Sequence, residues 1–179
     1  MTSFRLLGPG LVDGAAVIPL SGADFPFALV DAEEYPRLIH FKWRIMVTCG
    51  LAYAMRSVGG KSMLMHREIM SAPSGLQVDH INRNGLDNRR SNLRLCSATE
   101  NAGNTTKSRK LRGASRFKGV HLTRDGTIAV CAKVRLGTFP TEEAAARAYD
   151  DAARARWGEF ARLNFPRAGE QGALVEEAA

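Results

Sequence analysis

Short runs that mix apolar and polar residues fill the N-terminal part of the chain, and this pattern predicts an α+β fold. Apolar runs of strand length predict strands over residues 16–20 (AVIPL), 27–30 (FALV), 43–48 (WRIMVT) and 51–57 (LAYAMRS). Residues 31–43 predict a helix, either with Asp31 and Glu34 as a capping box or, because Pro36 is late for a first-turn proline, with a start nearer Glu33. A second, short helix is expected over residues 63–70 (MLMHREIM), before a Pro/Gly/Ser turn.

The middle of the chain predicts the order strand, loop, strand, helix. Residues 77–81 (QVDHI) and 93–96 (LRLC) are strand-like, and the loop between them, 82–92 (NRNGLDNRRSN), is rich in turn-forming residues. The helix is expected to begin at SATEN, with Ser97 as N-cap and Glu100 at the third helical position. Polar side chains therefore gather between two strands and at the start of a helix.

The C-terminal part predicts a small sheet followed by one long helix. Residues 105–115 are basic, polar and without periodicity, which is typical of an exposed linker. From 116 to 139 the pattern predicts strands, with an Asp-Gly pair as a hairpin turn. The Ala-rich stretch 141–158 predicts a helix capped by Thr141 and ended by Gly158. Its Ala and Tyr residues are more typical of core packing than of a site, and we see no internal repeat.

Composition bounds the class of protein. With 179 residues and 45% hydrophobic content, the chain is long enough for one ordinary domain or two small ones. No apolar run approaches the roughly 18 residues that a membrane-spanning helix needs, and the N-terminus does not resemble a secretion signal. Cys49, Cys96 and Cys131 are isolated, as in reduced cytosolic proteins, and no CxxC pair is present. We therefore expect a cytoplasmic protein, nucleoid-associated or in a bacterial or phage-host cytosol.

Charge is distributed unevenly. The net charge of +7 makes a polyanion the first partner to consider and an anionic membrane the second. Residues 66–120 hold eleven Lys or Arg against four acidic residues, which accounts for the whole excess. The tail, 169–179, is acidic and is expected to be disordered. The middle of the chain is therefore the expected footprint on a phosphate backbone.

The polar groups of the central segment suit hydrolysis of a phosphodiester, which needs an activated water, a cation and donors that hold the backbone. His80 has the side-chain type that acts as a general base near neutral pH. Asp79 offers a hard oxygen for Mg²⁺ or Mn²⁺, and Asn101 on the helix start offers a second oxygen. Asn92 is placed to fix the imidazole through its side-chain amide.

These residues resemble the ββα-metal motif of HNH endonucleases of the homing type, over roughly residues 15–104. The resemblance implies that Asp79 and His80 are the Asp-His pair, Asn92 the middle Asn, and Asn101 the ligand on the helix. The last position is Asn rather than His, as in the phage-type branch of the family, which favours magnesium over zinc. The stretches MHRE and LDNRRSNLRL also resemble these proteins.

Other interpretations of the same residues stay open at this point. An Asp-His pair alone is more often structural than catalytic, Asn92 is also a plain turn residue, and Asn88 and Asp87 suit loop formation. His66 suits packing, hydrogen bonding or phosphate contact. We expect the basic residues around the motif to contact DNA, although they also suit a solvated face or a structural role: Arg67, Arg83, Arg89, Arg90 and Arg94.

Residues 116–168 resemble the DNA-binding domain of plant ethylene-response (Apetala-type) factors in the stretches FKGV, LGTFPTEEAAARAYDDAA and ARLNFP. The resemblance implies three strands on one helix, with the sheet entering the major groove of DNA. It also implies DNA contacts from the strand positions Lys118, His121, Arg124, Lys133 and Arg135. Ile128 replaces the Trp usual in that family, and the connection between the second and third strands is short, so base readout is less expected than phosphate contact.

The sequence thus predicts a metal-dependent DNA endonuclease made of a nuclease domain (1–104, motif about 76–104), a basic linker (105–115), a DNA-binding domain (116–168) and a tail. One set of catalytic groups per chain predicts nicking of double-stranded DNA by a monomer or weak dimer, without an obligate protein partner. The alternative is a catalytically silent DNA-binding regulator. RNA binding ranks third, because a sheet in a major groove suits B-form DNA better than A-form RNA.

Overall fold

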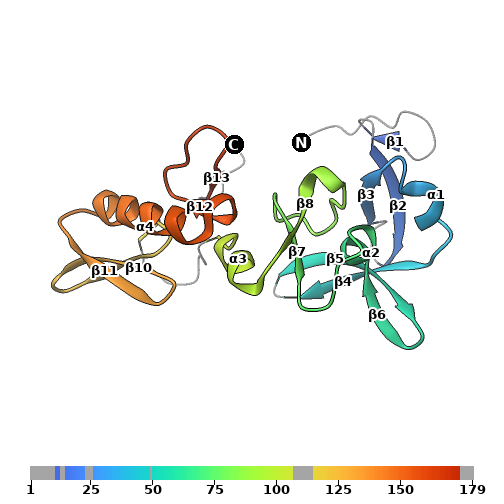
Figure 1. Cartoon of the computed structure of the whole chain (residues 1–179), viewed down its shortest axis with the longest axis horizontal. Coiled ribbons are helices and arrows are strands. Elements are labelled where there is room, and N and C mark those ends of the chain that lie inside the picture. The colour runs from blue at the N-terminus through green and yellow to red at the C-terminus, as the bar shows by residue number, and fades with distance from the viewer. Residues whose placement is uncertain (1–10, 13–14, 23–25, 49, 107–114, 174–179) are drawn as a thin grey trace. The chain divides into compact units, whose positions relative to one another are not determined.

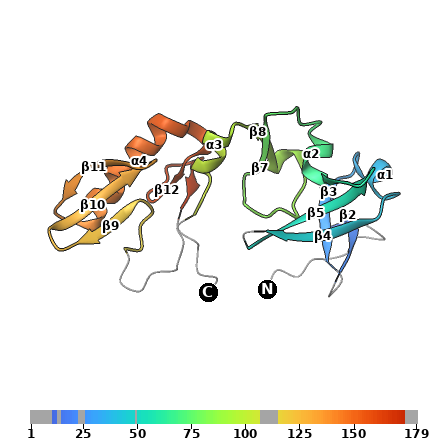
Figure 2. The ribbon, with the colours of Figure 1, turned by 90° about the horizontal axis from the view of Figure 1, so that it is seen from below.

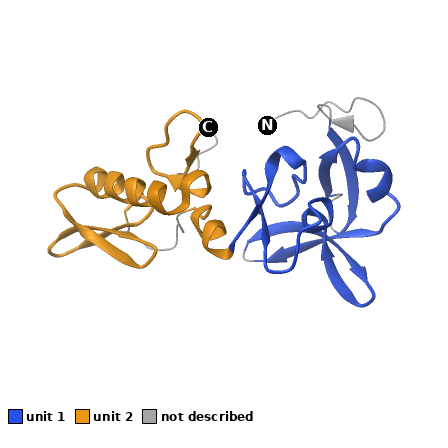
Figure 3. Ribbon diagram, in the orientation of Figure 1, with its two compact units in different colours: residues 1–97 blue, residues 98–179 orange. Residues whose placement is uncertain are grey.

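The computed structural model describes residues 11–12, 15–22, 26–48, 50–106 and 115–173, which fall in two compact units, 1–97 and 98–179 (Figure 3). Helices and strands occur in both units, so the α+β class predicted from the sequence is confirmed. Most of the expected basic linker, 107–114, lies outside the described residues, as does Cys49. No helix in the described ranges is both long and apolar enough to cross a membrane.

The first unit is built on one mixed sheet with the strand order β1-β2-β4-β5-β6, and β3 pairs with β2 beside this path (Figure 1). All pairings given for its described strands are antiparallel except the short parallel one between β2 and β4. The four predicted strands are confirmed as β2 Ala15–Ser21, β3 Phe27–Asp31, β4 Trp43–Thr48 and β5 Leu51–Val58. The pattern did not predict β1 Leu11–Val12 and β6 Lys61–Leu64.

The helix expected over 31–43 is mostly wrong, because α1 covers only Tyr35–Leu38. Trp43 explains the early end: it opens β4, is 1% exposed, and its indole N–H donates to the Leu38 carbonyl at 2.9 Å. The predicted capping box is also wrong. The Asp31 carboxylate accepts the backbone N–H of Arg90 at 2.8 Å instead, which ties the central loop to this part of the unit.

The central segment follows this sheet in the chain and forms a short helix and a small two-stranded sheet within the first unit. Helix α2 (Met65–Ile69) is shorter than predicted and packs against β5 and β7. Strands β7 (Gln77–His80) and β8 (Leu93–Cys96) pair antiparallel, and a 3₁₀ turn, η1 (Arg90–Asn92), enters β8. Val78 and Leu93 join these strands to the main core, whose other large buried side chains include Ile18, Val30, Leu38, Trp43, Met65 and Ile69. The segment therefore rests on a packed apolar core.

The second unit combines a short helix, a three-stranded antiparallel sheet in the order β11-β10-β9, and a long helix along one face of that sheet (Figure 2). The Asp-Gly hairpin turn is confirmed between β9 and β10, and Thr141 caps α4 by accepting the N–H of Ala144 at 3.1 Å, as predicted. The bounds are α3 Ala98–Gly103, β9 Val120–Thr123, β10 Gly126–Cys131, β11 Val134–Phe139, α4 Glu142–Trp157, η2 Gly158–Phe160, β12 Arg162–Leu163 and β13 Gln171–Gly172.

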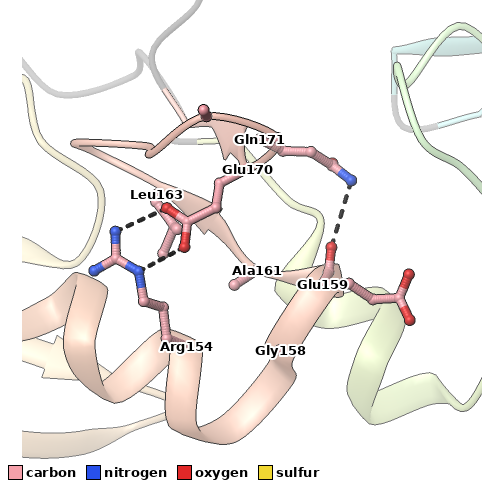
Figure 4. Close-up of a pocket in the computed structure, with 9 residues that line it drawn as sticks. Arg154, Gly158, Glu159, Ala161, Leu163, Glu170 and Gln171 are labelled. Atoms are coloured by element: carbon pink, nitrogen blue, oxygen red, sulfur yellow. Dashed lines mark hydrogen bonds and ion pairs between the residues drawn. The ribbon is translucent and has the colours of Figure 1, made fainter.

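The expected disordered tail is wrong for residues 169–173, while 174–179 lie outside the described residues. Strand β13 pairs with β12, and Ala173 is 1% exposed. The Glu170 carboxylate accepts two hydrogen bonds from Arg154 at 2.8 and 2.9 Å, beside an open pocket of about 360 Å³ (Figure 4). The same Arg154 bonds lower the pKa of Glu170 to about 2. The acidic composition of the tail did not predict that Glu170 would bind Arg154.

Candidate active site

Asp79 and His80 are adjacent on β7 and both are buried, at 6% and 5% exposure. Across the strand pair, Asp79 faces Arg94, whose Nε and Nη2 donate to the Asp79 Oδ2 at 2.9 and 2.8 Å. This ion pair fixes the orientation of the carboxylate. A carboxylate held in one orientation suits the role of a metal ligand.

The His80 imidazole has an amide neighbour in the central loop. Its Nε2 lies 3.4 Å from the Oδ1 of Asn88, a side chain with 0% exposure. Burial lowers the pKa of His80, while Asn88 and the carboxylates of Asp79 and Asp87 act in the opposite direction. The neutral imidazole, the form that accepts a proton, is therefore favoured.

Asn92 was expected to fix this imidazole, but its amide serves the loop instead. Its Nδ2 donates to the Asn82 Oδ1 at 2.9 Å and to the Asp87 carbonyl at 2.8 Å, and its Oδ1 accepts the N–H of Asn82 at 2.9 Å. Both amide hydrogens and the oxygen are thus engaged. The neighbour of His80 is Asn88, which the sequence suggested only as a loop former, and no local signal distinguishes the two residues.

Two of the arginines expected on DNA join the central segment to the rest of its unit. Arg67 donates to the backbone carbonyls of the 72–76 turn, at 2.7 to 3.2 Å. Arg90 donates to the Glu34 carboxylate at 2.7 Å and to the Ile69 carbonyl at 2.8 Å. These bonds give both arginines a structural role in holding the loop in place, and their DNA contact stays a prediction.

Three further arginines lie in or beside the loop. Arg89 donates to the Asp87 carboxylate at 2.8 and 2.6 Å. Arg94 is committed to Asp79 as described, with a side chain only 11% exposed. Arg83 stands at a left-handed backbone position, φ +63°, and is half-buried. Arg89 and Arg94 therefore have internal carboxylate partners, and their DNA contact stays a prediction.

The donor atoms at Asp79 suit a hard divalent cation, which takes carboxylate and amide oxygens and keeps several waters. Within the described ranges, no group of three or more His, Cys, Asp or Glu side chains is placed to hold a metal ion. Asn101, the second expected ligand, is half-buried on α3 in the second unit.

Helix α3 is held by the second unit through the buried side chain of Lys118. Its Nζ donates to the Gly103 carbonyl at 2.8 Å, and the residue is 8% exposed. A Cβ at Gly103 would lie 2.8 Å from the Trp157 ring, so the helix end packs directly on α4. Arg162 adds a bond to Asn104 at 2.6 Å. The ammonium of Lys118 is thus directed into the protein, which argues against the predicted DNA contact.

The other expected contacts of the C-terminal sheet are exposed: His121, Arg124, Lys133 and Arg135. Ile128 pairs with His121 on β9 and with Thr138 on β11, and it alternates with Thr127 and Ala129, which are buried. Ala132 and Lys133 form the short β10–β11 connection with φ values of +50° and +69°. The sheet therefore presents basic side chains on its strands and at two turns.

Comparisons with known proteins find one family model and two similar proteins. The family model for HNH endonucleases matches residues 71–102. An uncharacterized HNH endonuclease of Acanthamoeba polyphaga mimivirus is 31% identical over 144 residues, which cover 77% of this chain and 74% of the viral protein. Dehydration-responsive element-binding protein 2A of Arabidopsis thaliana is 69% identical over 32 residues, 18% of this chain and 10% of the plant protein. No solved structure matches the chain significantly.

Proposed function

Because this chain belongs to the HNH endonuclease family, we propose that it is a metal-dependent endonuclease that hydrolyses a phosphodiester bond of double-stranded DNA. The observation that carries the proposal is the buried Asp79-His80 pair on β7, inside the matched segment 71–102. The homing-type branch of the family is the expected subclass, on the strength of the MHRE and LDNRRSNLRL stretches.

Each polar group at the pair has a role in this reaction. His80 accepts the proton of the attacking water, and Asn88 holds its imidazole from the loop side. Two hydrogen bonds from Arg94 hold the Asp79 carboxylate in one orientation. Asp79 would hold Mg²⁺ or Mn²⁺ through its carboxylate oxygens. The cation offsets charge on the phosphate and the leaving oxygen.

The loop between β7 and β8 supports these groups rather than reacting. Asn92 and Arg89 bind loop atoms, and Arg90 anchors the loop to α1 and α2. One such set of groups per chain supports cleavage of one strand per event. We therefore propose nicking, with a double-strand break requiring two chains or two events.

We expect the protein to convert supercoiled plasmid to the nicked form in the presence of Mg²⁺ or Mn²⁺, and EDTA to abolish the reaction. Gel electrophoresis of plasmid incubated with the full chain measures this directly. A gel shift on several substrates with no nicking under either metal would support the silent DNA-binding regulator instead. Nicking that persists at full rate in EDTA would contradict the metal requirement.

We also propose that the C-terminal sheet tethers the enzyme to DNA. Support comes from the exposed His121, Arg124, Lys133 and Arg135, and from the short similarity to a plant protein named as an element-binding protein. Exposed basic side chains of this kind neutralise phosphates of the DNA backbone. The half-buried Ile128 has an apolar side chain that forms no hydrogen bond to a base.

Replacing Lys133 and Arg124 together by methionine is expected to lower the salt slope of DNA binding by about 0.9 for each phosphate that is no longer neutralised. Replacing Lys118 by methionine is the matched control. It removes one positive charge that is buried and bonded to Gly103, so the slope should stay unchanged. Fluorescence anisotropy at several salt concentrations measures the slope. Equal slopes for all variants would remove the sheet from the binding surface.

A further inference from the structure

Three aromatic side chains of the first unit form a ring cluster: Tyr53 on β5, His66 on α2 and His80 on β7. Neither Tyr53 nor His66 lies in the matched segment 71–102. His66 is as buried as His80, at 5% exposure. The proton-accepting imidazole of the proposed function therefore has a second imidazole as its direct neighbour.

The rings meet at defined angles. The His66 and His80 centroids lie 4.9 Å apart with planes at 87°, an edge-to-face contact. Tyr53 contacts both rings, at 5.6 Å from His66 and 5.8 Å from His80. Aromatic pairs at such distances prefer edge-to-face geometry, so rotation of one ring is resisted by its neighbours.

The cluster also lies under the central loop. A Cβ at Gly85 would meet the Ala52 carbonyl at 2.3 Å and the Tyr53 ring at 2.6 Å, so the loop backbone packs directly on β5. His80 is thus held from two sides. Asn88 contacts it from the loop, while His66 and Tyr53 contact it from the helix and the sheet.

Stability does not explain a histidine at position 66. Its Nδ1 is buried, and no protein group in the described part of the chain bonds to it. An unpaired buried polar atom destabilises a fold, and an apolar side chain of similar volume would avoid that penalty. Burial, with smaller effects of His80 and Arg67, lowers the pKa of His66 to about 3, so the ring stays neutral beside the catalytic base.

We propose that His66 is a positioning residue for His80: its ring, packed edge-to-face, sets the plane in which the catalytic imidazole accepts the proton. The inference rests on the proposed function of His80 as general base. Misplacement of a catalytic group by about 1 Å lowers rates by up to about 10²-fold, so the plane of this ring matters to the rate. DNA affinity does not depend on it.

The test uses His66→Leu in the full chain, which keeps buried volume but removes the flat ring and the unpaired nitrogen. We expect kcat for plasmid nicking to fall about tenfold or more with nearly unchanged KM, because only the reacting geometry changes. Thermal stability should be equal or higher. His66→Phe, which restores a ring, should recover part of the rate. Ile69→Ala on the same helix should lower stability without lowering kcat.

A second readout does not depend on activity. In ¹H–¹³C spectra, the His80 ring signals should shift or broaden in His66→Leu and stay in place in Ile69→Ala. The proposal is overturned if His66→Leu keeps kcat within about twofold of wild type, the margin of a non-participating residue, or leaves the His80 signals unchanged. His66→Gln serves the same test if the leucine variant does not fold. Failure of the wild type to nick, or full activity of His80→Ala, would refute the proposed function instead.

Discussion

Replacing His80 by alanine is expected to slow nicking by about 10²–10⁴-fold, the usual contribution of a positioned base. The side chain is buried beside Asn88, and among the described residues the imidazole in ring contact with it is that of His66. His66 is held neutral with a pKa of about 3 and is a poor substitute base. Single-turnover rates at saturating enzyme measure the chemical step without the influence of DNA affinity.

His40→Ala is the matched control for this variant. His40 is an exposed histidine of the same unit, so both variants replace one histidine by alanine. The His40 variant should cut DNA at the wild-type rate. Binding of DNA by the His80 variant should also match wild type, because the buried imidazole is not a phosphate contact in this proposal. A His80→Ala protein that cuts at the wild-type rate would remove the assignment of the base.

Gly119→Ala is expected to destabilise the second unit by about 2–5 kcal/mol, the sum of overpacking and a left-handed backbone. At φ +74°, a Cβ would lie 2.0 Å from the ring of Tyr149, a core residue with 3% exposure. The ring is part of the core between α4 and the sheet and cannot withdraw without opening that core. The variant should therefore lose the C-terminal sheet and, with it, most of the DNA affinity.

Gly169→Ala separates the two causes. Gly169 has a comparable φ of +83°, but no described atom lies within 4 Å of an added Cβ, so only backbone strain of about 1–2 kcal/mol remains. Native-state hydrogen exchange of the α4 backbone amides reports on the stability of this unit. Equal losses of stability for the two variants would show that the Tyr149 contact is not the reason for a glycine at position 119.

Local patterns predicted much of the fold because they depend on neighbours in sequence. Short apolar runs predicted β4, β5, β7 and β8, and a capping threonine with a terminal glycine predicted α4. The helix over 31–43 failed because burial of Trp43, a tertiary effect, outweighed local helix propensity. The turn-forming residues between β7 and β8 correctly predicted a loop. They did not predict that the amide beside His80 would be that of Asn88 rather than Asn92.

The sequence by itself determined that the Asp79-His80 pair lies at the end of a strand and that basic residues surround it. Both features depend only on the spacing of residues along the chain. Tertiary structure decided which side chains bind other groups of the protein and which remain exposed to solvent. Arg90 meets Glu34 across 56 positions, Lys118 is directed to Gly103 rather than to solvent, and His66 packs on His80. Such partners come from segments distant in sequence, and only packing of the apolar core brings them together.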